Sequence, residues 1–376
     1  MKFQLNDDQR ALQDAVKSYL RDKFGPAEVR KLYDTEAGMP DSLWSAISEQ
    51  GWLAVLVPEA FDGLGLGLLD AAIIARAFGA ATVPGPWLGT VLVGEALRLA
   101  GSEAQQKAHL PQLAAGELKG AVALLKGGYK PTPAGAPAKA DGGKLTGRLE
   151  LVEYAEAADI LVVAAQDGLY LVDPSLTTIT AHESLDRTVR LATVELNGVA
   201  GERLENSTPE AVQELLDRAA VLAASDLAGI ARKALTETVE YDKTRVQFGK
   251  PVGSFQAIKH DLADLLVMVT MAEHAATYAA YAVDADLPDK AVAVSIAKAK
   301  AADTARKATS DMIQYHGGIG YTWEHDAHFY FKRAKRLEYA FGDAAQHRER
   351  IAAALLDGAT DQGHLQTDGT EMAVGA

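Results

Sequence analysis

The sequence predicts a mainly α-helical protein with a small β domain in the middle of the chain. Two observations indicate this fold class. Apolar residues recur at helical spacing before residue 119 and again after residue 207. Between these segments, residues 120–206 carry glycine, proline and short apolar runs that are typical of strands. The expected order is therefore α–β–α, with domains at residues 1–119, 120–206 and 207–356.

The first domain is expected to be an all-α bundle. Asn6 and Gln9 have the spacing of a capping box. The apolar residues after them keep a helical period until Gly25 and Pro26 end the helix. The same criteria predict further helices over residues 42–50, 68–78, 88–100 and 103–114.

The middle domain is expected to begin at Gly120, where the composition changes. Residues 127–143 are rich in glycine and proline and are predicted to form a loop. Strands are predicted over residues 160–164, 168–172 and 189–196, the last because its residues alternate between two faces. These runs indicate a small sheet.

The third domain is expected to be helical again. Ser207 and Glu210 have the spacing of a second capping box, which predicts the start of a helix. Long helices are predicted over residues 222–242 and 255–281, and helical spacing continues to about residue 356. Residues 357–376 are polar and contain glycine, so we expect a disordered tail.

Composition excludes several functions. The formal net charge is −14, which makes a nucleic-acid partner improbable. The chain has no cysteine, so disulfides and thiol nucleophiles are excluded. The sequence has no stretch of about 18 consecutive apolar residues and no apolar signal region, so we expect no membrane span and a cytoplasmic location. Glu324, His325 and His328 could be metal ligands on adjacent turns, but a solvated helix start explains them better, and no metal site is predicted.

The connection between the two long helices, residues 245–260, concentrates groups that suit a phosphate. Arg245 supplies a cation, and Ser254 is a natural N-cap for the second helix. A helix N-terminus beside a cation suits a phosphate or pyrophosphate. The alternative is an ordinary helix hairpin with a polar turn, and composition alone favours that alternative.

Two motifs of this domain resemble signatures of the acyl-CoA dehydrogenase family of flavoproteins. The first motif reads RVQFGKPVGSFQ over residues 245–256, and the second reads QYHGGIGYTWE over residues 314–324. The resemblance implies a helical domain, a central β domain and a C-terminal four-helix bundle that builds a tetramer. It also implies flavin adenine dinucleotide (FAD) as cofactor and an acyl-CoA thioester as substrate.

The resemblance assigns cofactor contacts to both motifs. In the family, the arginine of the first motif reaches the FAD that is bound mainly to a neighbouring subunit. Arginine suits this contact because its fork can hold two phosphate oxygens and stays charged. The second motif has a glycine pair that lets backbone approach the adenosine part, although close helix packing would also explain small residues. The residues implied are Arg245, Gln247, Phe248, Gln256, Gln314, Gly317 and Gly318.

The family's catalytic base is missing from both positions where the family places it. In much of the family, a glutamate lies 24 residues after the first glycine of the second motif, and here that residue is Phe341. In another branch, the glutamate lies 26 residues before the motif arginine, and here that residue is Ala219. Asp343 is a weak substitute, since it is shorter and two positions along.

The stretch that would hold the flavin ring also departs from the family pattern. The corresponding residues are 124–131, LLKGGYKP, without the usual glutamate and Ser-Asp pair. No tryptophan occurs between Trp87 and Trp323, although the family places one against the flavin. The motif residues that would contact the FAD of a neighbouring subunit are therefore present. The residues that would hold the flavin ring of this chain's own FAD are not.

Three hypotheses remain. The chain resembles the small subunits of heteromeric bacterial acyl-CoA dehydrogenases that act on unusual esters such as steroid side chains, which predicts an α₂β₂ complex with a homologous subunit that carries the base. An electron-transfer flavoprotein or similar acceptor is then implied. Alanine-rich residues 291–308 would pack across the subunit interface.

Two alternatives to this hypothesis remain. One is a self-sufficient flavoenzyme that uses Asp343 or another carboxylate as its base, and the other is a non-catalytic scaffold.

Overall fold

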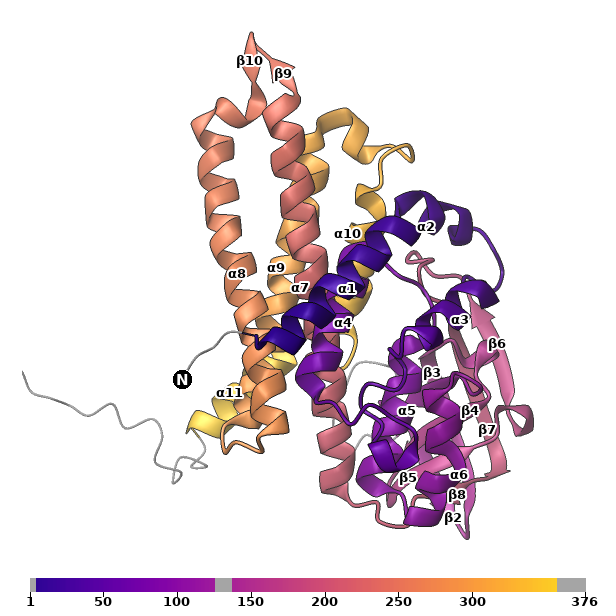
Figure 1. The fold of residues 1–376 in the computed structure, drawn as a ribbon. Coiled ribbons are helices and arrows are strands. Elements are labelled where there is room, and N and C mark those ends of the chain that lie inside the picture. Colours follow the sequence, from indigo (N-terminus) through magenta and orange to yellow (C-terminus); the bar gives the residue numbers. More distant parts are fainter. Residues whose placement is uncertain (1–4, 126–136, 357–376) are drawn as a thin grey trace, which may run out of the picture.

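The protein is mainly α-helical with one central β-sheet, as the sequence predicted (Figure 1). A computed structural model describes residues 5–125 and 137–356. The predicted tail, most of the predicted loop over residues 127–143, and most of the flavin-ring stretch lie outside these residues. No helix in the described ranges combines the length and the apolarity needed to cross a membrane.

The N-terminal part is helical as expected. The predicted capping box is confirmed, because Asn6 accepts a hydrogen bond from the Gln9 backbone and the Gln9 side chain reaches back to Asn6. Pro26 also begins a helix that the sequence did not predict, since proline fits the first turn. The helices are α1 (Asp7–Lys23), α2 (Pro26–Tyr33), α3 (Asp41–Glu49), α4 (Leu68–Ala81), α5 (Trp87–Ala100) and α6 (Glu103–Ala114).

The central sheet has eight strands in the order β6-β7-β3-β2-β4-β5-β8, with β1 paired to β4 in parallel. The predicted loop is wrong where it overlaps β2, and four further strands of the described sheet, β1, β3, β6 and β8, were not predicted. Helix α5 packs on β1. The strands are β1 (Gly120–Ala123), β2 (Ala138–Asp141), β3 (Lys144–Glu153), β4 (Ile160–Ala165), β5 (Gly168–Val172), β6 (Thr178–His182), β7 (Leu191–Ala200) and β8 (Glu202–Arg203).

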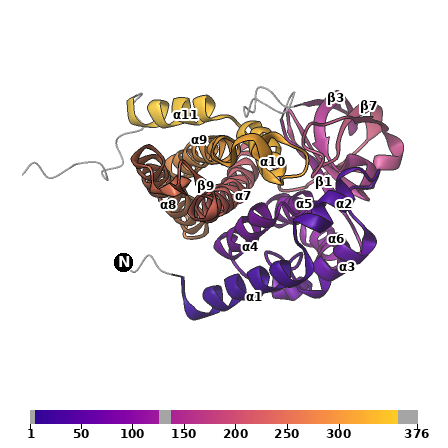
Figure 2. The same ribbon diagram turned by 90° about the horizontal axis from the view of Figure 1, so that it is seen from above.

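The C-terminal helices form the expected bundle, with α9 at its centre (Figure 2). The buried alanines of α9 face neighbouring helices of the same chain, so they are not free for the subunit contact that the sequence suggested. A short hairpin of β9 (Val246–Gln247) and β10 (Lys250–Pro251) joins the first two helices. The helices are α7 (Pro209–Thr244), α8 (Gln256–Asp284), α9 (Lys290–His316), α10 (Ala327–Tyr339) and α11 (Ala344–Leu356).

Two predicted helix caps are wrong. Thr208, not Ser207, caps α7, because the Ser207 hydroxyl accepts a hydrogen bond from the Leu169 backbone in the sheet. Ser254 does not cap α8, which begins at Gln256 after a short 3₁₀ turn. In both places tertiary contacts or turn geometry override a local signal.

Glycines bring α4 and α7 into close contact. A Cβ atom on Gly229 would lie 1.9 Å from the Arg76 carbonyl oxygen, and one on Gly79 would lie 2.1 Å from the Asp226 carbonyl oxygen. Any side chain at these positions would therefore push the two helices apart. This crossing anchors the bundle to the N-terminal helices.

Candidate active-site cavity and cofactor-contact hairpin

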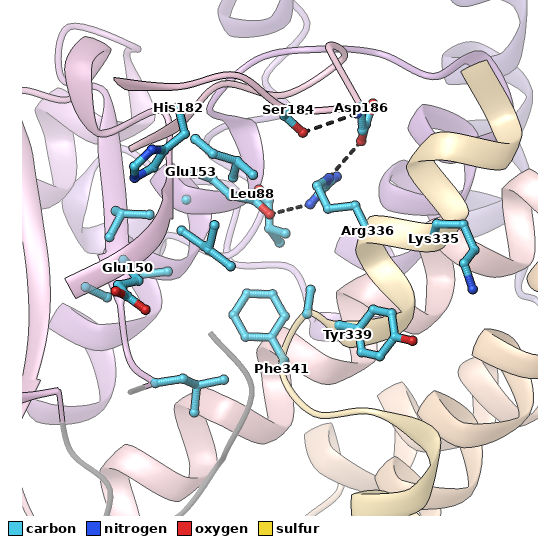
Figure 3. A pocket seen from close by; sticks show the side chains of 18 of the residues that line it. Leu88, Glu150, Glu153, His182, Ser184, Asp186, Lys335, Arg336, Tyr339 and Phe341 are labelled. Carbon is cyan, nitrogen blue, oxygen red and sulfur yellow. Dashed lines mark hydrogen bonds and ion pairs between the residues drawn. The ribbon is translucent and has the colours of Figure 1, made fainter. Parts of the chain in front are cut away.

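A cavity of about 440 Å³ lies where α5, the sheet and the end of α10 meet (Figure 3). This size suits one small-molecule ligand or a part of a larger one. Leu88, Leu92, Leu124 and Leu125 give it an apolar wall. Ionisable side chains gather on the side formed by β3, the loop after β6, and α10.

Phe341 points its ring into this cavity (Figure 3). The count from the second motif predicts that this residue takes the first of the two family base positions, where an aromatic ring would replace the carboxylate. Its backbone has φ = 56°, which is uncommon for a non-glycine residue. The surroundings must therefore hold the turn in place.

Two buried side chains hold that turn by its carbonyl oxygens. Lys298 is fully buried in α9, and its Nζ donates to the Gly342 oxygen at 2.7 Å and to the Glu338 oxygen at 3.1 Å. His347 of α11 donates from Nε2 to the Phe341 oxygen at 3.1 Å, and its Nδ1 lies 3.4 Å from the Ser295 hydroxyl. Burial lowers the pKa of Lys298 to about 7 and that of His347 to about 3.

Because His347 is buried, we expect the free energy of unfolding to depend on pH. Its folded pKa of about 3 lies below the ordinary value of 6.5, so the folded chain binds fewer protons than the unfolded chain between these values. The free energy of unfolding should therefore fall as the pH falls from about 6.5. Between pH 6 and 5, wild type should lose about 1 kcal/mol more than His347→Gln. Urea denaturation of both proteins at each pH measures this difference, and parallel curves would contradict it.

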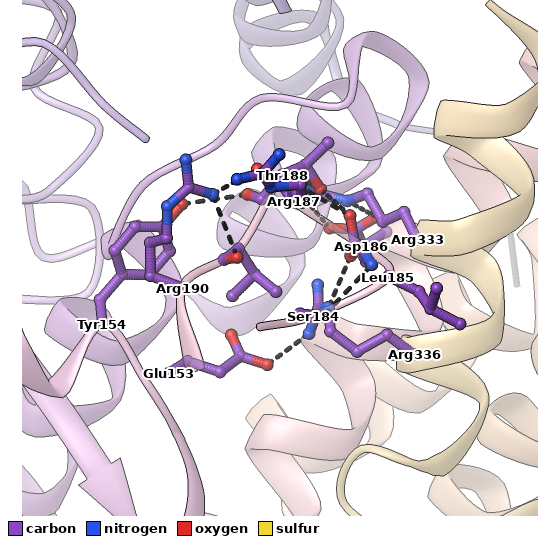
Figure 4. Close-up of polar contacts among 12 residues, drawn as sticks. Glu153, Tyr154, Ser184, Leu185, Asp186, Arg187, Thr188, Arg190, Arg333 and Arg336 are labelled. Carbon is purple, nitrogen blue, oxygen red and sulfur yellow. Dashed lines mark hydrogen bonds and ion pairs between the residues drawn. The ribbon is translucent and has the colours of Figure 1, made fainter. Parts of the chain in front are cut away.

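Two carboxylates on the polar side of the cavity, those of Glu153 and Asp186, are bound by a single buried arginine (Figure 4). Arg336 forms ion pairs with Glu153 and, at 2.8 Å, with Asp186. Although burial acts to lower it, the pKa of Arg336 is raised by the charges of Glu153 and Asp186. Both carboxylates are therefore engaged within the chain by Arg336.

The neighbouring Arg333 ties four parts of the fold together. It pairs with Asp226 of α7 at 2.5 Å, and its Nη1 donates to the Val83 oxygen at 2.8 Å. Its Nη1 also lies 3.4 Å from the Thr188 hydroxyl in the central domain. The basic run 332–336 is thus largely paired within the chain: Lys335 lies 2.8 Å from Glu338, and Lys332 donates to the Tyr33 hydroxyl at 3.1 Å.

The other two candidate base positions do not face the cavity. Ala219 is fully buried in α7. Asp343 caps α11: its carboxylate accepts from the Gln346 backbone at 2.8 Å, and its own N–H donates to the Gln346 side chain at 3.0 Å. The geometry thus gives no support to Asp343 as a base.

The first motif forms an exposed arm at the end of the bundle (Figure 1). Phe248, at the tip of the hairpin, is 91% exposed and also has a positive φ of 52°. Arg245 and Gln247 are exposed, as is Gln256 at the start of α8. Within the part of the chain that the structure describes, the Arg245 side chain has no hydrogen-bond or ion-pair partner, although its backbone bonds to Tyr241 and Val252. An aromatic ring and a free cation held in solvent indicate a surface that another molecule covers.

The second motif lies at the same end of the bundle. Tyr241 near the end of α7 stacks on His316 at the end of α9, with ring centroids 4.3 Å apart. Gln314, Gly317 and Gly318 are exposed beside this contact. A Cβ on either glycine would meet no atom within 4 Å, so close helix packing within the chain does not explain the glycine pair. Backbone left open in this way can be approached closely by a ligand.

The cavity and the motif residues are separate. None of the seven motif residues lines the cavity. The second motif precedes α10, and the cavity lies at the other end of this 13-residue helix, about 20 Å away. Sequence reasoning missed that Glu153, Asp186 and Arg336 meet at the cavity and that Lys298 and His347 hold the turn of Phe341, because only the tertiary fold brings these residues together.

The residues present fit the two ends of FAD unequally. The open glycines and the free Arg245 fit its phosphate and adenosine part. In the cavity, Lys332, Lys335 and Arg336 are engaged with partners, and Glu153 and Asp186 place negative charge on the wall. A flavin that accepts a hydride becomes electron-rich, so such a wall disfavours it. The described part of the cavity does not fit a flavin ring.

Comparison with known proteins identifies an enzyme class. The model of the N-terminal domain of acyl-CoA dehydrogenases matches residues 6–117, and the model of the C-terminal domain matches residues 210–356. Acyl-CoA dehydrogenase IpdE2 of Mycobacterium tuberculosis is 37% identical over 331 residues, covering 87% of this chain and 91% of the relative. The chain therefore belongs to the acyl-CoA dehydrogenase family, whose cofactor is FAD. The predicted family and cofactor are confirmed at this level.

Other similar proteins agree over nearly the whole chain. IpdE2 of Mycolicibacterium smegmatis is 33% identical over 353 residues, covering 94% of this chain and all of the relative. The crystal structure of the ChsE4-ChsE5 complex from Mycobacterium tuberculosis contains a chain that superposes with a TM-score of 0.86 at 28% identity, covering 94% of this chain and 99% of that one. A variant of the Tcur3481-Tcur3483 steroid acyl-CoA dehydrogenase gives a TM-score of 0.85 at 27% identity.

Proposed function

We propose that this chain is one subunit of a heteromeric, FAD-dependent acyl-CoA dehydrogenase, in which a homologous subunit supplies the catalytic base and the flavin-ring site. The observation that carries the proposal is the difference between two regions of the chain, the end of the helical bundle and the cavity. The bundle end offers unpartnered contacts for a cofactor, whereas the cavity carries Phe341 at a base position and an internally paired ion cluster. This chain retains the residues that would contact the cofactor of a neighbouring subunit, but it lacks a base and the flavin-ring contacts for a site of its own. Such a chain is expected to pair with a different subunit that has them.

The outer face of α8 supports assembly. Ala263, Leu266, Val267 and Met271 lie on one side of this helix and are exposed. Exposed apolar residues at helical spacing form a surface that another helix can cover. This face takes the place of the alanine-rich segment, which the chain buries itself.

The similar structures favour two different chains. Two of them are described as pairs of differently named chains, ChsE4-ChsE5 and Tcur3481-Tcur3483, and the second is described as a steroid enzyme. By analogy we propose a bulky acyl-CoA ester, such as one from steroid breakdown, as substrate. An electron-transfer flavoprotein or similar acceptor would receive the electrons, and the cytoplasm would be the location.

The assembly and its flavin content test the proposal directly. We expect an α₂β₂ complex with two flavins, because each pair of chains offers one complete flavin-ring site. Native mass measurement of the co-purified complex, together with flavin absorbance per chain, decides the matter. One flavin for every copy of this chain, with no second polypeptide present, would contradict the asymmetric assembly.

Replacing the free cation of the hairpin should weaken flavin binding. Arg245→Ala in the complex should lower FAD affinity by about 10–150-fold, since a charge-assisted contact contributes roughly 1.5–3 kcal/mol. The fold should survive, because Arg245 is exposed. Flavin absorbance after desalting measures retention. Lys243→Ala is the matched control, since this exposed lysine nearby is paired with Glu240. Equal retention in both variants would remove Arg245 from the site.

A further inference from the structure

A second pocket lies on the opposite side of α4 and α7 from the cavity. It has a volume of about 620 Å³ and is formed by α1, α4, α7, α8 and one residue of α10. Helix α1 packs on α4 (Figures 1 and 2), and its residues Gln13, Lys17, Leu20 and Arg21 form part of the pocket lining. None of its lining residues belongs to the cavity or to the two cofactor motifs.

The lining of this pocket is unusually basic for a chain with a net charge of −14. Three of its cations have carboxylate partners: Arg232 pairs with Glu273 at 2.5 Å, Lys233 with Glu237 at 2.5 Å, and Arg21 with Asp22 at 2.9 Å. The carboxylate of Glu273 is the only one that lines the described pocket, and Arg232 occupies it with two hydrogen bonds. The lining of the pocket therefore carries more positive than negative charge.

Arg76, in the wall formed by α4, has no carboxylate partner. Its Nη2 donates to the Glu273 carbonyl oxygen at 3.2 Å and to the Thr277 hydroxyl at 2.8 Å. Its Nε is buried and has no acceptor among the described residues. Burial lowers the pKa of Arg76, and the charge of Glu273 offsets only part of this effect. Buried charges in proteins are normally paired, which indicates that an anion is supplied from outside the chain.

Two further groups in the pocket lack partners. The side chain of Lys17 in α1 lines the pocket and has no ion-pair partner in the described chain. The hydroxyl of Tyr330 in α10 also lines the pocket and has no hydrogen-bond partner among the described residues, although Tyr330 is almost completely buried. Together with Arg76, they offer hydrogen-bond donors from three helices to one space. Leu20, Phe24 and Ile73 line the rest of the pocket, so an apolar body can accompany the charge.

We propose that this pocket binds an organic oxyanion, a carboxylate or a phosphate joined to an apolar group, with Arg76 as its principal contact. The volume lies in the range of small-molecule sites. The same chemistry could come from a free metabolite or from an acidic side chain of a neighbouring subunit. The inference does not depend on the proposed heteromeric dehydrogenase.

Octanoate and octyl phosphate are suitable probes, and 1-octanol is the uncharged match. Calorimetric titration of the complete assembly should show saturable binding of at least one anion and not of the alcohol. Arg76→Leu should weaken that binding by about 10–150-fold, as expected for a charge-assisted contact. Arg10→Leu removes a cation from α1 outside the pocket and should leave the affinity unchanged. Lys17→Leu, at an exposed position, gives a second test if Arg76→Leu fails to fold.

Thermal unfolding separates a binding role from a structural one. Without ligand, Arg76→Leu should be at least as stable as wild type, because it removes a half-buried charge that has no carboxylate partner. If neither anion binds but Arg76→Leu alone breaks the assembly in native mass measurement, the oxyanion is a neighbouring subunit's side chain. If neither anion binds and the variant assembles like wild type, or if octanol binds as well as the anions, the proposal is overturned.

Discussion

Purified without a partner, this chain is expected to oxidise acyl-CoA thioesters at least about 10²–10⁴-fold more slowly than the complete complex. That factor is the typical cost of losing a positioned general base. In the family's reaction a carboxylate removes the α-proton while the flavin accepts the β-hydrogen as hydride. Phe341, which occupies the first family base position and points into the cavity, cannot accept a proton.

Most other described carboxylates near the cavity are already paired or serve as a cap, whereas Glu183 lines the cavity and is exposed. Glu153 and Asp186 line the cavity but are bound to Arg336. Glu150 is partly exposed and lies 3.3 Å from Arg148. Asp343 caps α11. The slow rate should therefore persist at any substrate concentration, because the loss affects the chemical step.

Stopped-flow reduction of the flavin, measured for the chain alone after FAD is added and for the complex, tests this expectation. Phe341→Glu is an informative control. If the base were all that the chain lacked, this variant would gain activity on its own. We expect no gain, because the described cavity does not fit a flavin ring either. A wild-type chain that alone matches the complex would contradict the proposal, and Asp343→Asn and Glu183→Gln would then identify the base.

The sequence predicted those parts of the fold well that depend on interactions between residues close together in the chain. The capping box at Asn6 needs only residues within one helical turn, and it forms as expected. The cap at Ser207 failed because a strand backbone, that of Leu169, competes for the same hydroxyl. Strand β3 escaped prediction because its register is irregular, with Leu151 at a positive φ of 58°.

The candidate site was predictable in part for the same reason. Contiguous motifs pointed to Arg245 and Gly317, and both prove exposed and open at one end of the bundle. The sequence also located Phe341 by counting from a motif. It gave no sign of the Arg336 ion cluster, since the partners of Arg336 are 150 and 183 residues away. Nor did it show that Lys298 and His347 hold the turn of Phe341, because buried ionisable residues resemble surface residues in sequence.

The buried pair of Arg333 and Asp226 should be the most sensitive point of the scaffold. Asp226→Ala is expected to destabilise the protein by about 3–5 kcal/mol, because it leaves a guanidinium buried without a counter-charge. Arg333 is 7% exposed and Asp226 is 9% exposed, so water cannot replace the lost partner. Although burial acts to lower it, the pKa of Arg333 is raised by the charge of Asp226. Thermal unfolding should show a fall in Tm of roughly 4–6 °C, because the unfolding entropy grows with chain length.

Two controls separate the pair from the general cost of a mutation. Asp7→Ala breaks the ion pair of an almost fully exposed aspartate with Arg10 and should cost less than about 1 kcal/mol. The double variant Asp226→Leu/Arg333→Met removes both charges and should recover most of the stability lost in Asp226→Ala, since an apolar pair of similar volume is often tolerated. If the double variant is as unstable as Asp226→Ala, then packing or the bond from Arg333 to the Val83 oxygen, and not the unpaired charge, accounts for the loss.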